Sequence, residues 1–223
     1  MGEIKNNMNN KKRQGKFILA GTCGLLFVIW IVLVRTVDVD SIGPEGTRIG
    51  LSHINKSVSD LFGQRLFWYD ATEVLGVIAI LVAAAFALTG LIQLIKRKSL
   101  AKVDKEIFAL GGLYIIVIGL YALFEVIVIN YRPVIMPGEE HPEASFPSSH
   151  TMLICVVMGS TIMLLDKYIK NNSLCNALKI LCAIIMVVTV VGRLISGAHW
   201  FTDIIGGVLI SIALLSFFSG LLE

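Results

Sequence analysis

Six long apolar stretches divide the chain, and short polar or charged segments separate them. They cover residues 17–34, 74–95, 107–130, 150–165, 178–192 and 203–221. A helix needs about 20 mainly apolar residues to cross the hydrocarbon core of a bilayer, so these stretches predict six transmembrane helices, of which the fourth and fifth are short. The pattern indicates an all-α, polytopic membrane helical bundle in one six-span domain, residues 17–223.

The overall composition favours the bilayer as the solvent of this chain. Its mean hydropathy is +0.80 and only 16% of its 223 residues are charged, so a soluble domain of this size would lack an interior for most of its apolar surface. Basic residues precede the first apolar stretch, as in a signal peptide, but no small-residue cleavage site appears before Arg35. We therefore expect a retained first helix.

Basic residues are concentrated in alternate connecting segments. Residues 1–16 contain five Lys or Arg, residues 96–105 five and residues 167–179 three, whereas only six of the 19 lie elsewhere. Because short basic loops stay in the cytoplasm, this distribution predicts a multi-pass protein of the cell (plasma) membrane with both termini cytoplasmic. Residues 1–16 are also polar and Asn-rich, and we expect them to form a disordered basic cytoplasmic tail.

The longest segment on the other side of the membrane, residues 35–73, contains a mildly amphipathic stretch over residues 49–67. Its apolar residues recur at helical spacing: Leu51, Ile54, Val58, Leu61 and Phe62. This pattern is typical of an extracytoplasmic helix that lies at the membrane interface, over a site on that side. A helix that caps the end of the bundle would show the same pattern.

Three polar clusters stand out, and all fall on the extracytoplasmic side of the predicted topology. The first follows the third apolar stretch at Arg132-Pro133. Proline disfavours a helical residue before it, so Arg132 should stand on extended chain at the membrane exit, where its planar guanidinium suits two phosphate oxygens. An isolated Arg at a helix end is more often an interfacial anchor.

The second cluster, Pro147-Ser148-Ser149-His150, opens the fourth apolar stretch. A helix N-terminus binds anions through its free N–H groups and its dipole, and the hydroxyls of Ser148 and Ser149 add donors. Capping of the helix is the ordinary use of such serines and is compatible with phosphate binding. His150 is placed where an imidazolium could protonate a leaving oxygen.

The third cluster connects the last two apolar stretches and contains Arg193, His199 and Asp203. If His199 opens the sixth helix, Asp203 lies one turn later on the same face. A carboxylate hydrogen-bonded to one ring nitrogen fixes the tautomer and frees the other nitrogen to attack phosphorus. Ionisable residues this close to hydrocarbon indicate a functional site, although a structural ion pair between Arg193 and Asp203 would also explain two of them.

The combination of arginine-proline, proline-serine-x-histidine and arginine-x5-histidine-x3-aspartate resembles the type 2 phosphatidic acid phosphatase family of integral membrane lipid phosphatases. The resemblance implies that His199 is the nucleophile, Asp203 its partner and His150 the general acid. It also implies a phosphate-binding set, which comprises Arg132, Arg193, Ser148 and Ser149. The family needs no metal or other cofactor, so none is expected here.

Three positions depart from the family pattern. Glu125 stands where the family has a lysine, seven residues before the arginine, Ser149 replaces a glycine and Gly192 replaces a serine. Glu125 matters most as a modulator, since exchange of one unit charge about 4 Å from the phosphate changes the interaction by roughly 4 kcal/mol at an effective dielectric near 20. Either Glu125 is protonated or paired with Arg132 or Arg193, or it meets a cationic part of the substrate.

The sequence therefore predicts an enzyme, a phosphoric ester or diphosphate hydrolase that acts on a lipid phosphate through a phosphohistidine. Undecaprenyl diphosphate, phosphatidylglycerophosphate and phosphatidic acid all present a suitable terminal phosphate. The alternatives are a non-catalytic lipid-phosphate binder or carrier, a phosphotransferase with a non-water acceptor, and a metal hydrolase built on His141, His150 and His199. The expected partners are the lipid phosphate and the bilayer, without nucleic acid, and the sequence does not specify an oligomeric state.

Overall fold

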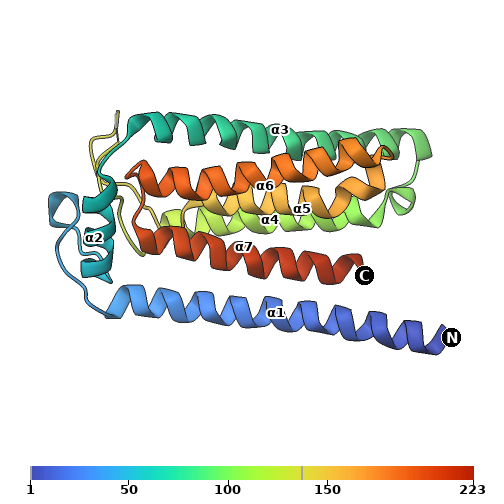
Figure 1. The fold of residues 1–223 in the computed structure, drawn as a ribbon, viewed down its shortest axis with the longest axis horizontal. Coiled ribbons are helices and arrows are strands. Elements are labelled where there is room, and N and C mark those ends of the chain that lie inside the picture. The colour runs from blue at the N-terminus through green and yellow to red at the C-terminus, as the bar shows by residue number, and fades with distance from the viewer. Residues whose placement is uncertain (1, 137) are drawn as a thin grey trace.

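The computed structural model describes residues 2–136 and 138–223, and its long helices lie side by side in one bundle (Figure 1). The helices are α1 Gly2–Thr36, α2 Ser52–Phe62, α3 Leu66–Arg97, α4 Lys105–Val126, α5 Ser149–Tyr168, α6 Asn172–Ile195 and α7 Phe201–Leu222, with short 3-10 turns at Pro44–Gly46 and Leu100–Lys102. Six of them are long and apolar enough to cross a membrane. The predicted all-α fold with six spans is confirmed.

The predicted span boundaries are close to the observed ones, with two informative differences. Helix α1 includes most of the basic segment that was expected to be disordered, so that segment is helical. Helix α4 ends at Val126, and not at Asn130 as the hydropathy pattern predicted. The four residues after Val126 therefore belong to the loop that carries Arg132, because the chain leaves the helix before its apolar run ends.

Helix α5 forms the centre of the bundle. Two-thirds of its most apolar window is buried, whereas α3, α4 and α6 bury much less of theirs. It packs against α3, α4, α6 and α7, while α1 packs along α7 on the outside. The buried residues Ile154, Val156, Val157 and Met158 fill the space between them. Helix α5 is therefore packed on several sides by its neighbours.

Two adjacent glycines in α7, Gly206 and Gly207, allow the segment before α5 to approach α7 closely. A Cβ at Gly206 would lie 2.6 Å from the ring of Phe146, and one at Gly207 would lie 3.1 Å from the carbonyl oxygen of Ser148. Any larger residue at Gly206 would push the segment away. The absence of side chains at these two positions thus places the second polar cluster against the first part of α7, which carries Asp203 of the third cluster.

Helix α2 crosses one end of the bundle, opposite the end where both termini lie (Figure 1). Its polar residues Ser52 and Asn55 are buried against the protein, while Ile54 and Leu61 are exposed. The Asn55 side chain accepts a hydrogen bond from the Thr202 N–H and donates one to the Thr202 hydroxyl. The helix predicted for this segment is present, and it is fastened to the start of α7 through polar contacts.

Candidate active site

The three polar clusters meet at the end of the bundle that α2 crosses. Backbone hydrogen bonds join their segments directly: the N–H of Ser148 donates to the carbonyl of Asp203 at 3.0 Å, and the N–H of Ser145 donates to the carbonyl of Asn130 at 3.0 Å. The connections after α4 and α6 are therefore tied to the loop before α5. Residues that are far apart in the sequence form one site.

His199 lies in the loop between α6 and α7, two residues before α7 begins, and is 4% exposed. Its Nδ1 lies 3.1 Å from the backbone carbonyl of Ser145, so Nδ1 carries the hydrogen and donates it. Its Nε2 is buried and has no hydrogen-bond partner in the described part of the chain. This tautomer leaves a lone pair on Nε2, the atom that a nucleophilic histidine would use.

The surroundings of His199 favour the neutral imidazole. Burial lowers the pKa of His199 well below its ordinary value, and the guanidiniums of Arg132 and Arg193 act in the same direction. A cationic ring would be desolvated and repelled by both arginines. At neutral pH the lone pair of Nε2 is therefore free of a proton.

Asp203 does not make the expected hydrogen bond to His199. Its Oδ2 lies 3.8 Å from Nδ1 of His199, beyond hydrogen-bond distance, and accepts instead from the N–H of Trp200 at 3.0 Å. Its other oxygen accepts from the side-chain amide of Asn130 at 3.2 Å. Because α7 begins at Phe201, Asp203 caps its first turn, and the carbonyl of Ser145 fixes the tautomer. Asp203 still lies close enough to stabilise positive charge on the ring.

Arg193, in the last turn of α6, is completely buried and pairs with a carboxylate that the sequence motifs did not include. Its Nη2 donates to Oε1 of Glu73 in α3 at 2.6 Å, and its guanidinium stacks on the ring of Tyr69 with 4.9 Å between their centres. Arg193 does not form the alternative ion pair with Asp203, because it is paired with Glu73. Nε and Nη1 of Arg193 have no hydrogen-bond partner among the described residues.

Arg132 stands in the loop after α4, as its proline predicted. Its Nε lies 3.0 Å from a carboxylate oxygen of Glu143, and its backbone N–H donates to the carbonyl of the same residue. Buried Nη1 has no hydrogen-bond partner in the described chain. Arg132 therefore combines a fixed backbone with donors that remain free for an anion.

The two serines of the second cluster differ in their surroundings. Ser148 is fully buried and caps α5, since its hydroxyl accepts from the N–H of Thr151 at 3.4 Å. Ser149 lines the main cavity of the protein. The next residue, His150, lines the same cavity and contacts Glu73, with 3.2 Å between Nε2 and Oε2. Of the two serines, Ser149 is therefore better placed to contact a ligand.

The main cavity has a volume of about 940 Å³ and extends between α3, α4 and α5. One end of the cavity is polar and contains Arg132, His150 and His199. Farther from these residues its walls are apolar and consist of Val77, Ile80, Ala83, Ala84, Ala87, Val117, Ile118 and Leu153. Several of these wall residues are exposed on the outer surface of the bundle, including Val77, Ile80 and Ile118. The cavity is thus polar at one end, apolar along its length and open toward the side of the bundle.

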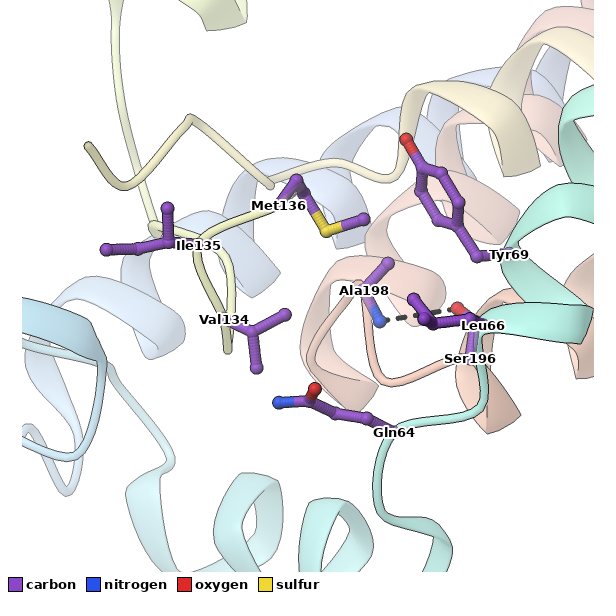
Figure 2. Close-up of a pocket in the computed structure, with 8 residues that line it drawn as sticks. All are labelled: Gln64, Leu66, Tyr69, Val134, Ile135, Met136, Ser196 and Ala198. Atoms are coloured by element: carbon purple, nitrogen blue, oxygen red, sulfur yellow. Dashed lines mark hydrogen bonds between the residues drawn. The ribbon is translucent and has the colours of Figure 1, made fainter. Parts of the chain in front are cut away.

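A smaller pocket of about 130 Å³ lies where the outer loops meet (Figure 2). The α2–α3 connection, the start of α3, the loop after Arg132 and the α6–α7 loop line it, and Ala198 N donates to the hydroxyl of Ser196 at 3.3 Å. Tyr69 and Met136 line both this pocket and the main cavity. Among the described residues, only these two line both the small pocket and the main cavity.

Glu125, in the last turn of α4, lines the main cavity and is exposed. Of the alternatives for Glu125, the pairing with an arginine is not formed, because Arg193 is paired with Glu73 and Arg132 with Glu143. His141 is also exposed, and its nearest ion pair is with Glu45 at 3.8 Å. Within residues 2–136 and 138–223, no group of three or more His, Cys, Asp or Glu residues is arranged to hold a metal ion.

A sequence model described as the PAP2 superfamily matches residues 107–222, more than half of the chain. The chain belongs to this superfamily. The type 2 phosphatidic acid phosphatase family that the three motifs predicted is thereby confirmed, and with it a multi-pass membrane protein of the phosphatase class. No curated protein sequence matches the chain.

The fold of this PAP2 protein is similar to a solved structure from Bacillus subtilis, described as the first transmembrane PAP2 type phosphatidylglycerolphosphate phosphatase. The two chains are 17% identical, with a TM-score of 0.58, and the similarity covers 91% of this chain and 94% of the other. At this identity the comparison supports the shared fold. The PAP2 match begins at residue 107, so Glu73 and the rest of α3 lie outside it.

Three residues of the site, Glu73, Asn130 and Glu143, belong to none of the three sequence motifs. Glu73 was hidden because one carboxylate at the start of an apolar stretch looks like the polar edge of a span. Asn130 and Glu143 lie on either side of Arg132 in the sequence, at separations that neither helical nor strand periodicity would bring together. Their roles become visible only through the hydrogen bond of Asn130 to Asp203 and the ion pair of Glu143 with Arg132.

Proposed function

We propose that this PAP2 protein is a metal-independent lipid phosphatase that hydrolyses a phosphate monoester or diphosphate through a phosphohistidine. The observation that carries the proposal is a group of buried polar atoms without hydrogen-bond partners at one end of the bundle, where Arg132, His150 and His199 line the main cavity. They are Nη1 of Arg132, Nε and Nη1 of Arg193, Nδ1 of His150 and Nε2 of His199. Buried donors are normally satisfied, and a phosphate with three acceptor oxygens would satisfy the arginine donors.

In the first half of the proposed reaction, Nε2 of His199 attacks phosphorus while Arg132 and Arg193 hold the non-bridging oxygens. The new N–P bond forms as the P–O bond to the lipid breaks, and His150 gives a proton to the departing oxygen. Asp203 and the carbonyl of Ser145 stabilise the positive charge on the ring of His199. Most of the rate gain comes from the fixed guanidiniums, since phosphoryl transfer depends mainly on positioning and charge stabilisation.

In the second half, water attacks phosphorus and the N–P bond breaks. His150 accepts the proton of the water, which restores both histidines to their starting states. Inorganic phosphate then leaves toward the aqueous side. The small pocket in Figure 2 lies next to the site on that side, and Tyr69 and Met136 separate the two spaces. A shift of these side chains would open a short exit route.

The lipid chain is proposed to lie in the apolar part of the cavity. The stretch of α3 that lines it, from Glu73 to Ala87, rises by about 21 Å along the helix. Undecaprenyl diphosphate, phosphatidylglycerophosphate and phosphatidic acid remain the candidate substrates, and the description of the Bacillus subtilis protein supports the second of these. The openness of the cavity toward the side of the bundle supports access directly from the bilayer.

The active site is proposed to face the outside of the cell. Both termini lie at the opposite end of the bundle (Figure 1), as do the basic residues at the α3–α4 and α5–α6 connections. Retention of basic segments in the cytoplasm would then place that end inside and the phosphate site at the outer surface of the plasma membrane.

The test is phosphate release from a panel of purified lipid phosphates in detergent, with a strong chelator present. We expect turnover of at least one lipid, a loss of about 10³-fold or more in His199→Ala, and no loss in His53→Ala, whose imidazole is exposed on α2. Full activity of His199→Ala on every lipid would contradict the proposal.

Three other outcomes would identify the alternatives. Loss of activity in chelator would favour a metal hydrolase, and binding of labelled lipid without phosphate release would favour a carrier. Transfer of labelled phosphate to an added alcohol in preference to water would favour a phosphotransferase. Each outcome is distinct from simple inactivity of His199→Ala, because each is measured on the unmodified protein.

A further inference from the structure

Glu73 connects two groups of the site that the motifs place on different helices. One oxygen of its carboxylate lies 2.6 Å from Nη2 of Arg193, and the other lies 3.2 Å from Nε2 of His150. Among the described residues, Glu73 is the only carboxylate in an ion pair with either of these side chains. It comes from α3, outside the residues that match the PAP2 superfamily. The established family match therefore says nothing of this residue.

The backbone of α3 is shaped to bring Glu73 and His150 together. A Cβ at Gly76, one turn after Glu73, would lie 3.1 Å from Cδ2 of His150 and 3.2 Å from its Nε2. That contact is tight enough to displace the ring. Glycine at this position thus allows Cδ2 and Nε2 of the ring to approach α3 closely, with Nε2 next to the carboxylate of Glu73.

Other charged groups around His150 are cationic or already engaged. Arg193 from α6 and His199 from the α6–α7 loop act on it directly. From α7, Asp203 is occupied by Trp200 and Asn130.

Two more carboxylates line the cavity near the α4 side, and neither is paired with His150. Glu143 is engaged by Arg132, and Glu125 lies on the cavity wall at the end of α4. Without Glu73, no carboxylate would offset the electrostatic repulsion between a protonated His150 and the guanidinium of Arg193. Glu73 supplies the negative charge at hydrogen-bond distance from the ring.

The contact of Glu73 also determines which nitrogen of His150 is free. Because Nε2 faces the carboxylate, its hydrogen is held there, and Nδ1 remains as the second nitrogen. Nδ1 is buried and has no partner in the described chain, and His150 lines the cavity that receives the phosphate. A protonated ring would present Nδ1–H as its only uncommitted donor.

We propose that Glu73 is a positioning residue that orients His150 with Nδ1 directed at the leaving oxygen of the substrate and, together with the bound phosphate anion, stabilises the imidazolium form that donates the proton. This inference rests on the proposed phosphatase function. When the P–O bond breaks, the proton moves from Nδ1 to the departing lipid oxygen, and the ring becomes neutral while Nε2–H stays with Glu73. In the second half the proton of the attacking water returns to Nδ1.

The proposal makes the effect of Glu73 depend on the leaving group. An alkyl lipid phosphate needs a proton on its departing oxygen, whereas p-nitrophenyl phosphate releases a stable phenolate without one. General acid catalysis contributes about 10²- to 10⁴-fold. Glu73→Gln should therefore lower kcat about 10²-fold on the lipid substrate and less than about threefold on p-nitrophenyl phosphate.

The matched control is Asp70→Asn, one turn earlier on α3, where the carboxylate is exposed and lies outside the cavity lining. It should leave both rates unchanged. The conservative variant Glu73→Asp keeps the charge and should recover part of the lipid rate. The pH above which kcat on the lipid declines should also move lower in Glu73→Gln, since the ring in the substrate complex loses a charge that retains its proton.

A double-mutant comparison separates positioning of His150 from support of Arg193. In a His150→Asn background, Glu73→Gln should cause no further loss of kcat on the lipid if Glu73 acts through His150. Equal losses on both substrates, or a rise in KM with unchanged kcat, would overturn the proposal and assign Glu73 to Arg193 alone. If Glu73→Gln does not fold, equal losses of Glu73→Asp on both substrates would overturn it in the same way. If the unmodified protein released phosphate from neither substrate, the proposed function itself would fail, and this inference with it.

Discussion

The two ends of the bundle both carry a network of charged side chains, but the networks differ in how completely they are satisfied. At the end that bears the termini, Asp104 pairs with Arg97 at 2.9 Å, and Lys167 pairs with Glu106 at 2.6 Å and with Asp104 at 3.3 Å. Arg97 and Lys167 are exposed, so their remaining donors reach water, and none of the buried unpartnered side-chain atoms in the described chain belongs to Asp104 or Glu106. This network joins α3, α4 and α5 and is complete without a ligand.

At the opposite end, Arg132, Arg193, His150 and His199 are all buried or nearly so, and each retains a nitrogen without a hydrogen-bond partner. Burial of a polar group without a partner costs about 1–3 kcal/mol or more. A protein that completes one network and leaves the other open has a use for the open one. The difference indicates that charge alone does not mark the functional end, whereas unsatisfied buried charge does.

The largest expected effect is the difference between two substitutions, Arg193→Ala in the network that retains unpartnered nitrogens and Lys167→Ala in the satisfied network. Arg193→Ala should lower kcat/KM on the lipid substrate by about 10³-fold, because it removes the donors that meet charge in the transition state. Lys167→Ala should change kcat/KM less than about twofold and the free energy of unfolding by less than about 1 kcal/mol, as for a partly exposed pair. Similar losses in both variants would remove the distinction between the two ends.

A smaller effect is expected from Gly76→Ala, which tests the close contact between α3 and His150. The added Cβ would displace the ring by a few tenths of an ångström, and we expect kcat to fall about tenfold, since catalytic geometry tolerates little displacement. Gly111→Ala is the matched control, because nothing lies within 4 Å of a Cβ at that position of α4. Unchanged kcat in Gly76→Ala would show that His150 does not need its observed position.

Glu125→Lys restores the charge that the family pattern has at this position. Because Glu125 is exposed and pairs with neither arginine, we expect it to repel the phosphate, and its replacement should lower KM up to about tenfold at low ionic strength and less at high salt. Lys56→Glu, on exposed α2, serves as a control for a remote change of charge. Abolished turnover in Glu125→Lys would instead indicate that Glu125 meets a cation of the substrate.

The smallest signal is spectroscopic and concerns His199 alone. Its lowered pKa and its hydrogen bond to Ser145 predict a neutral ring with hydrogen on Nδ1. In nitrogen NMR of histidine-labelled protein, with His199→Asn to assign the signal, this ring should stay neutral as the pH falls from about 7.5 to about 5.5, because protonation begins only near a group's own pKa. Titration with a midpoint near 6.5 would contradict this description of the nucleophile.

The spans and the motif residues could be predicted from the sequence, because each rests on a local rule. Bilayer thickness sets the length of an apolar run, and Arg132, His150 and His199 stand in short patterns with a chemical meaning. The contacts of those residues follow from packing across the bundle and have no local signal. Thus Asp203 was expected to hold His199, but the carbonyl of Ser145 does so.

For helix α2, too, the local sequence pattern predicted the element but not its contacts. Its periodicity predicted a helix but not which face meets the protein. Asn55 is fully buried because it bonds to both the backbone and the side chain of Thr202, so this polar residue faces the protein while Ile54 stays exposed. Likewise Glu73 became a site residue only because the glycine at position 76 allows α3 to approach His150.

The lateral opening of the main cavity has a consequence for kinetics. Its walls between α3 and α4 reach exposed side chains such as Ile80 and Ile118, which face hydrocarbon in a membrane. A substrate that arrives through this opening diffuses in two dimensions, so the enzyme responds to the mole fraction of lipid in its surface rather than to the amount per volume. Added inert detergent would then dilute the substrate and slow turnover even when the total quantity of lipid stays constant.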